Sequence, residues 1–432
     1  MRTPGSRVPR PDKAITRRDT VQDKRSAAAA ARLQRFLSLA DFEIAARRHL
    51  PRPLFEYLSG GAEDNASRGD NRRAFGEIGF VTRVLRNVSS RSQATTLFGQ
   101  RYESPFGIAP MGISALMAYR GDVVLAQAAA RSGVPMIMSG SSLIRLEDVV
   151  QAAPDTWFQA YLPGDAGKIS ELVERVDRAG VRTLVLTVDT AVLANRENNI
   201  RAGFSTPLRP SARLAWEGVT HPRWLLGTAL RTLARHGMPH FENSYATRGA
   251  PILSAKAARD FGAKDHLNWE HVDLIRRQWK RTLVVKGIMN HEDARTARAR
   301  GVDGIIVSNH GGRQLDGTVS PLRVLPDIVR AVGPGFPVMM DSGLRRGTDV
   351  LKALALGASF VFVGRPFAYA ATVAGQPGVE RAIRLLADEV QRDLGLLGLM
   401  GVSELDPSQL RALHPCAPLS GAGPRILQEE AA

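Results

Sequence analysis

The sequence predicts an α/β fold, a closed (β/α)8 TIM barrel, from two observations. Eight apolar runs of strand length recur between residues 106 and 366, and amphipathic helical stretches separate most of them. Continuously apolar strands are typical of parallel sheets that are covered on both faces, and eight such units favour closure into a barrel. An open, doubly wound sheet is the alternative fold.

Each predicted strand is an apolar run that ends in polar residues or glycine. The runs are residues 106–109, 135–138, 157–162, 183–188, 282–285, 304–307, 337–340 and 360–363. The clearest helical patterns between them lie at residues 123–132, 166–179, 291–300, 322–332 and 348–356. Because active sites of such barrels lie at the carboxyl ends of the strands, the residues directly after each run are the candidates for function.

The remaining segments flank or interrupt the predicted barrel, which spans residues 106–415. Residues 1–32 are rich in Arg, Pro and Ala and predict a disordered basic tail, and residues 416–432 predict a C-terminal tail. Residues 33–105 predict a helical N-terminal segment, in which Asp41 caps a helix that extends to Arg48. The connection at residues 198–267, after the fourth strand, is much longer than one helix requires, which predicts an inserted lid or binding loop.

The insertion interleaves apolar residues with arginines, above all at residues 222–226 and 230–236. This composition suits a surface that lies on an anionic bilayer. Packing of Trp224 and the leucines onto the barrel or a neighbouring subunit explains the same pattern equally well.

Composition excludes several classes of function. The net charge of +16 could indicate a nucleic acid or an anionic membrane as partner. However, the arginines are spread along the chain and aromatic residues make up only 6%, so no base-stacking platform is visible and we expect no nucleic acid partner. The single Cys416 excludes an intrachain disulfide or a multi-thiolate metal site. With no bilayer-length apolar run and no secretory signal, we expect a cytoplasmic protein.

One strand end carries a base and a cation. His310 and Arg313 follow the run at residues 304–307, and the two glycines between them permit a tight turn. An imidazole and a fixed guanidinium can act together on one small anion. A strand-capping histidine with a solvated arginine is the simpler interpretation of an isolated pair. Chemically useful residues at the other strand ends argue against it.

Nearly all of the remaining strands are also followed by polar, charged or glycine residues. They are Pro110, Met111 and Gly112; Ser139; Gln159 and Tyr161; Thr187 and Asp189; Lys286; Asp341, Ser342 and Gly343; and Gly364 and Arg365. The glycines and arginines at residues 341–347 and 363–366 predict a phosphate site, for a phosphorylated substrate or a mononucleotide cofactor. The sequence has no glycine-rich dinucleotide motif after a first strand. Lys286 could face a ring that becomes negatively charged, or form a Schiff base.

From about residue 39 to 405 the chain resembles the FMN-dependent L-2-hydroxy-acid dehydrogenases and oxidases, which include glycolate oxidase, L-lactate dehydrogenase and mandelate dehydrogenase. Residues 308–316 resemble the active-site signature of this family, and residues 59–64, 186–189, 285–287 and 341–347 match further motifs in the expected order. Residues 221–243 are most similar to the membrane-associated lactate and mandelate dehydrogenases. The resemblance implies a homotetramer that contacts the inner face of the cytoplasmic membrane peripherally.

The resemblance also implies an activity. A lactate-like or mandelate-like L-2-hydroxy acid would be oxidised to the 2-oxo acid, and a quinone or other acceptor would receive the electrons. An oxidase that uses oxygen and releases hydrogen peroxide is the alternative. Gly112 stands where soluble oxidases carry alanine, and Ser141 stands where glycolate oxidase carries a large aromatic side chain. Both changes imply a wider pocket that could admit aryl or branched acids.

The resemblance assigns a role to each candidate. The residues implied to bind FMN are Pro110, Met111, Gly112, Ser139, Gln159, Thr187, Lys286, Ser308, Asp341, Ser342, Gly343, Arg345, Gly364 and Arg365. Those implied to bind the substrate are Tyr57, Tyr161, Arg196 and Arg313. His310 would be the catalytic base, and Asp189 would orient it and stabilise the imidazolium. No metal is implied.

Overall fold

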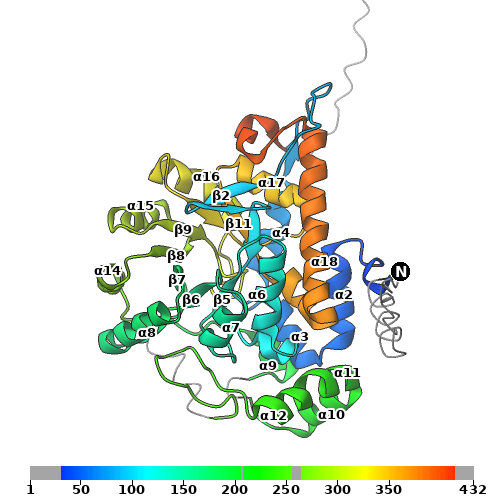
Figure 1. The fold of residues 1–432 in the computed structure, drawn as a ribbon, viewed down its shortest axis with the longest axis vertical. Helices are drawn as coiled ribbons and strands as arrows, with labels where there is room; N and C mark the ends of the chain where they lie inside the picture. Colours follow the sequence, from blue (N-terminus) through cyan, green and yellow to red (C-terminus); the bar gives the residue numbers. More distant parts are fainter. Residues whose placement is uncertain (1–30, 206–207, 255–263, 414–432) are drawn as a thin grey trace, which may run out of the picture. The chain divides into compact units, whose positions relative to one another are not determined.

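The computed structural model describes residues 31–205, 208–254 and 264–413. The chain divides into two units, Met1–Leu37 and Ser38–Ala432, and the second contains the barrel. Its eight parallel strands are β4 (Phe106–Ile108), β5 (Ile137–Ser139), β6 (Trp157–Ala160), β7 (Thr183–Thr187), β8 (Thr282–Ile288), β9 (Gly304–Val307), β10 (Val338–Met340) and β11 (Phe360–Val363) (Figure 1). Each predicted apolar run coincides with one of these strands.

The sheet closes into a barrel. Its strands follow the order β4-β11-β10-β9-β8-β7-β6-β5, and every neighbouring pair is parallel. The two end strands also meet, because the Ile108 N–H donates to the Pro135 carbonyl at 2.9 Å and Ile108 forms a parallel bridge with Met136. The predicted (β/α)8 barrel is therefore confirmed, and the open sheet is wrong.

Side chains fill the barrel interior. Alternate strand residues such as Val185, Val284, Ile306 and Met339 form one buried cluster. A hairpin of β2 (Thr95–Leu97) and β3 (Gln100–Tyr102) adds Leu97 and Tyr102 to this cluster, with the Tyr102 ring 5.6 Å from that of Phe360. Since Phe360 begins β11, the hairpin covers the amino-terminal end of the strands. The carboxyl end stays accessible for a site.

The helices around the sheet confirm the five predicted helical patterns. Those five are α6 (Gly121–Arg131), α8 (Ala166–Arg178), α15 (His291–Ala299), α16 (Pro321–Val332) and α17 (Gly347–Ala355), and α7 (Leu146–Ala152), α14 (Trp269–Gln278) and α18 (Arg365–Leu397) complete the layer. Polar side chains at three helix starts satisfy free backbone N–H groups: Asp165 caps α8, Asn290 caps α15 and Ser320 caps α16. α18 contains a break at Ala374 and Gly375, where the backbone leaves helical geometry.

The N-terminal segment precedes the barrel in the chain. It contains α2 (Leu39–His49), α3 (Arg52–Ser59), α4 (Ala66–Gly76) and β1 (Ile78–Phe80), which pairs antiparallel with β12 (Leu410–Ala412). The predicted cap of α2 is wrong in detail: Ser38 is the N-cap, and Asp41 lies at the third helical position, where it accepts the Ser38 N–H at 2.9 Å. Most of the predicted basic tail, and all of the C-terminal tail with Cys416, fall outside the described residues.

The insertion after β7 is largely helical where it is described. It contains α9 (Glu197–Ala202), α10 (Ala212–Thr220), α11 (Pro222–Trp224), the π-helical turn η1 (Leu225–Leu230) and α12 (Arg231–His236), which Figure 1 shows grouped together. Trp224 is tied to the barrel, since its indole N–H donates to the Leu116 carbonyl at 2.7 Å in α5 (Ser114–Met117). Leu226 and Leu230 stay exposed, so the insertion both packs on the barrel and presents apolar surface. None of the described helices is long and apolar enough to cross a membrane.

Candidate active site

His310 and Asp189 form a hydrogen-bonded pair at the carboxyl ends of β9 and β7. His310 Nδ1 lies 3.0 Å from Asp189 Oδ1, and both side chains are mostly buried. Gly287 makes room for the carboxylate, because a Cβ at this position would lie 2.7 Å from the Cβ of Asp189. With Nδ1–H donated to Asp189, Nε2 of His310 is the nitrogen that can accept a proton.

The surroundings of the pair determine its charge. Burial lowers the pKa of His310 below its ordinary 6.5, and this effect outweighs the Asp189 carboxylate, which raises it. Burial alone would raise the pKa of Asp189. The positive charge that His310 carries when protonated, and its hydrogen bond, lower this pKa by a larger amount, so the net shift is downward. At neutral pH the imidazole is therefore neutral beside an ionised carboxylate, which is the state that a general base requires.

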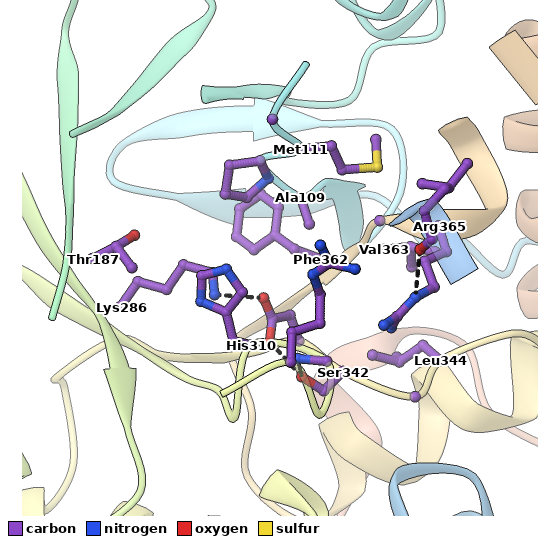
Figure 2. Close-up of a pocket in the computed structure, with 18 of the residues that line it drawn as sticks. Ala109, Met111, Thr187, Lys286, His310, Ser342, Leu344, Phe362, Val363 and Arg365 are labelled. Atoms are coloured by element: carbon purple, nitrogen blue, oxygen red, sulfur yellow. Dashed lines mark hydrogen bonds and ion pairs between the residues drawn. The ribbon is translucent and has the colours of Figure 1, made fainter. Parts of the chain in front are cut away.

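A cavity of about 780 Å³, including its open mouth, lies beside this pair (Figure 2). Most of the candidate residues line it: Tyr57, Pro110, Met111, Gly112, Tyr161, Thr187, Lys286, His310, Arg313, Asp341, Ser342, Gly343, Arg345, Gly364 and Arg365. Sequence reasoning missed several other lining residues: Leu58, Ala109, Met117, Gly311, Leu344, Phe362 and Val363. Gly311, Leu344 and Val363 lie within the predicted stretches 308–316, 341–347 and 363–366. The other four have the apolar character of ordinary core residues, and no sequence signal separated them from the core.

The other five candidates lie beside the cavity or behind its wall. Ser139 and Gln159 are buried side by side, with the Ser139 hydroxyl donating to Gln159 Oε1 at 3.2 Å. Ser308 is buried and accepts a hydrogen bond from Lys286. Asp189 contacts the cavity through His310, and Arg196 lines a second cavity.

The second cavity encloses about 940 Å³, including its mouth. It shares five lining residues with the first: Tyr57, Gly112, Tyr161, His310 and Arg313. A Cβ on Gly112 would lie 3.1 Å from the Cβ of Ser141 and 3.3 Å from the Tyr57 hydroxyl oxygen. The small residues at 112 and 141 therefore keep space open where the two cavities meet, beside His310.

Two arginines face this junction. The Arg313 guanidinium lies 4.8 Å from the centre of the Tyr57 ring and donates to the Gly60 carbonyl at 3.1 Å. Arg196 donates from Nε to the Arg313 carbonyl at 3.1 Å and from Nη2 to Gln314 at 2.7 Å. Burial lowers the pKa of Arg313 to about 10, and the guanidinium is still charged at neutral pH. The junction therefore offers positive charge to a carboxylate.

The end of the first cavity that Arg345 and Arg365 line suits a phosphate. Burial lowers the pKa of Arg365 to about 9 and also lowers that of Arg345. The Arg365 side chain donates to the carbonyls of Leu58 and Gly60, and no carboxylate in the described part of the chain forms an ion pair with either arginine. Arg365 also begins α18, whose first backbone N–H groups favour an anion. Half-buried guanidinium groups beside a helix start fit a bound phosphate.

The opposite end has unpaired polar atoms. Gln159 Nε2 and Thr187 Oγ1 are buried and have no hydrogen-bond partner within the described structure. Buried polar atoms in native proteins usually have partners, so these two indicate a bound group that contains hydrogen-bonding atoms. Lys286 adds a buried ammonium group, 3.0 Å from Asp341 Oδ2. These donors, together with the phosphate end, fit the ring and phosphate of a flavin mononucleotide.

A closed (β/α)8 barrel with a carboxylate-oriented histidine beside a phosphate-binding cavity defines a cofactor-dependent barrel enzyme. The chain belongs to the FMN-dependent dehydrogenase family, whose model matches residues 46–412. FMN is therefore its cofactor, and the chain is an oxidoreductase.

Individual relatives agree with this assignment. An L-lactate dehydrogenase of Azorhizobium caulinodans is 39% identical over 377 residues, which is 86% of this chain and 98% of the relative. An (S)-mandelate dehydrogenase of Pseudomonas putida is 37% identical over 382 residues, 88% of this chain and 94% of the relative. The crystal structure of a monotopic membrane protein, (S)-mandelate dehydrogenase, superimposes with a TM-score of 0.81 at 36% identity, covering 87% of this chain and 99% of that one.

Proposed function

We propose that this protein oxidises an L-2-hydroxy acid, of the size of lactate or mandelate, to the corresponding 2-oxo acid. The observation that carries the proposal is the position of His310, which is paired with Asp189 and lies where the two cavities meet. Relatives named for lactate and for mandelate are about equally similar to this chain, which supports the class of acid. FMN, when bound, accepts the two electrons that the acid loses.

His310 is the base in this proposal. Its Nε2 takes one proton from the substrate, either from the α-carbon or from the hydroxyl group, and both routes use the same residues. Asp189 then stabilises the imidazolium, because its carboxylate already accepts the hydrogen bond from Nδ1.

Arg196 and Arg313 bind the substrate carboxylate, with Tyr57 and Tyr161 as neutral hydrogen-bond donors. Burial raises the pKa of Tyr161, so its hydroxyl keeps its proton at neutral pH. The space beside Gly112 and Ser141 receives the substituent of the acid.

The cofactor would occupy the first cavity. Pro110, Met111 and Gly112 line the ring; Ser139, Gln159, Thr187 and Ser308 supply polar contacts; Lys286 supplies positive charge; Asp341 and Ser342 face the ribityl chain; and Gly343, Arg345, Gly364 and Arg365 hold the phosphate. Gly343 also lets its loop pack against α4, since a Cβ there would lie 2.0 Å from the Asn71 carbonyl oxygen. Only glycine allows the loop to lie this close.

We further propose that the insertion rests on an anionic membrane and that the electrons pass to a quinone there. Trp216 and Leu226 are 68% and 64% exposed, and Arg223 and Arg235 are exposed in the same insertion. A neighbour described as a monotopic membrane protein supports this location. Transfer to oxygen, with release of peroxide, is the alternative, and a homotetramer stays an expectation from the family.

A panel of 2-hydroxy acids tests the proposal. We expect the yellow protein to bleach anaerobically with an L-2-hydroxy acid such as lactate or mandelate. Re-oxidation of the bleached protein by a quinone analogue or by oxygen then identifies the acceptor. A protein that retains FMN but is bleached by none of the acids would refute the proposed substrate class.

A further inference from the structure

The turn that carries His310 is part of a hydrogen-bonded ring that includes Lys286 and Ser342. Figure 2 shows these three residues at the first cavity. On one side, Ser308 Oγ accepts from Lys286 Nζ at 2.7 Å and from the His310 backbone N–H at 3.0 Å. On the other side, Asp341 Oδ2 lies 3.0 Å from Lys286 Nζ, and Asp341 Oδ1 accepts from the Ser342 hydroxyl at 2.9 Å. Ser342 Oγ in turn accepts from the Gly311 N–H at 3.0 Å, which completes the ring.

The two serine hydroxyl groups hold the two peptide planes that flank the Cα of His310. The His310 N–H belongs to the plane before this Cα, and the Gly311 N–H belongs to the plane after it. Hydrogen bonds to both N–H groups therefore restrict φ and ψ of His310, and with them the direction of its Cα–Cβ bond. The direction of that bond determines where the imidazole lies.

The turn needs such restraint. His310 has a φ of +58°, a left-handed conformation that is unfavourable for a residue with a side chain. Gly311 and Gly312 follow it with φ of +70° and +72°, and glycine backbones have many other conformations available. Ser342 itself has a φ of +77°, so a non-glycine residue is kept in a strained conformation that places its hydroxyl between Asp341 and Gly311.

We propose that Ser342 is a positioning residue for the base: its hydroxyl connects the His310 turn to the buried Lys286–Asp341 ion pair. This inference rests on the proposed role of His310. The place of Ser342 beside FMN then depends on its backbone, because its hydroxyl already donates to Asp341 and accepts from Gly311. Removing the hydroxyl loosens the peptide plane after His310 while the contacts of Arg365 and Arg345 with their surroundings remain.

Two variants distinguish the effect of losing the Ser342 hydroxyl from the effect of the backbone strain at this residue. Ser342→Ala removes the hydroxyl and keeps a side chain at positive φ, whereas Ser342→Gly removes the hydroxyl and relieves the strain. Ser104→Ala is the control, since Ser104 is a buried serine that precedes β4, at the opposite end of the barrel from Ser342. For each purified holoenzyme we would measure the dissociation constant of FMN, the unfolding temperature and the rate of anaerobic bleaching. Turnover with a dye as electron acceptor would give kcat and KM.

We expect both Ser342 variants to lose about 10- to 100-fold in kcat, the size of effect that a misplaced catalytic group produces, with KM and FMN affinity close to those of the wild type. Equal losses in the two variants would assign the effect to the hydroxyl. A loss in Ser342→Ala but not in Ser342→Gly would mean that the hydroxyl only offsets the backbone strain at Ser342, which would overturn the inference. Weaker FMN binding with a wild-type bleaching rate in the loaded enzyme would also overturn it.

The same experiment distinguishes this inference from the proposed function. If the wild type bleaches and both variants bleach as fast as the wild type, only the inference about Ser342 is wrong. If no acid bleaches the wild type, the proposed function is wrong and the inference about Ser342 falls with it.

Discussion

His310 Nδ1 lies 3.0 Å from Asp189 Oδ1, although 121 residues separate the two in the sequence. The contact exists because β7 and β9 both pair with β8, so that their carboxyl ends open onto the same face of the barrel. A buried carboxylate that accepts the Nδ1–H bond selects the tautomer in which Nε2 is free. The geometry of the barrel thus leaves Nε2 of the imidazole free to accept a proton.

Replacing Asp189 by Asn should lower kcat/KM by about 10²- to 10⁴-fold, because the amide cannot stabilise the imidazolium by charge. FMN binding should be retained. Anaerobic bleaching with the best acid of the panel measures the effect. Asp327→Asn, an exposed carboxylate on α16, is the control and should behave as the wild type. A wild-type rate in Asp189→Asn would exclude the proposed role of this carboxylate.

The pH dependence of kcat/KM should have an acid limb below pH 6.5. The base acts in its neutral form, so activity is half-maximal at the pKa of His310 and falls as the pH drops through it. Burial lowers this pKa below 6.5. Since the Asp189 carboxylate raises the same pKa, the limb of Asp189→Asn should move to still lower pH, beneath a reduced plateau. An acid limb above pH 6.5 in the wild type would contradict this assignment.

The sequence predicted the barrel and most of its mouth because both depend on local patterns. Each strand is a continuous apolar run, and barrel closure alone brings the polar residues after these runs together. Gly112, Lys286, His310 and Arg365 could therefore be placed in one cavity before their distances were known.

Other parts of the site depend on contacts that local patterns do not reveal. Leu58 and Met117 line the cavity, but each is an apolar residue in a short helix and has the pattern of core packing. The hydrogen bond that the Gly311 N–H donates to the Ser342 hydroxyl joins two loops 31 residues apart, so no spacing in the sequence indicated it. The helices of the insertion escaped prediction because arginines interrupt their apolar pattern.

Replacing Arg365 by Gln should weaken FMN binding by about 10- to 150-fold, the range expected for one lost hydrogen bond to a charged group. The half-buried Arg365 has no carboxylate partner within the described structure, which leaves its charge for a phosphate. Fluorescence titration of apoprotein with FMN measures the affinity. Arg330→Gln, at an exposed arginine on α16, should bind FMN normally. If Arg365→Gln binds FMN as tightly as the wild type, the phosphate lies elsewhere.

Charged substitutions in the insertion should release the protein from membranes. Trp216→Glu combined with Leu226→Glu removes two exposed apolar side chains and adds negative charge. We expect at least about tenfold weaker binding to vesicles that contain anionic lipid, with bleaching unchanged. Leu396→Glu, at a 65% exposed leucine on α18, is the control. Equal flotation of all three proteins with vesicles would refute the proposed contact.

Two glycines in the loop after β9 should respond differently to alanine. Gly317 has a φ of +83° and no atom within 4 Å of an added Cβ, so Gly317→Ala should cost only the backbone strain, about 1 kcal/mol. Gly312 has a φ of +72°, and an added Cβ would lie 2.5 Å from the Arg68 backbone nitrogen.

Gly312→Ala must therefore also push α4 away from the His310 turn, and we expect it to cost about 2–4 kcal/mol and to slow bleaching. Thermal unfolding of the two holoenzymes should rank Gly312→Ala well below Gly317→Ala. Equal unfolding temperatures would mean that the loop moves aside without cost, and that the close contact between α4 and this turn does not hold His310 in place.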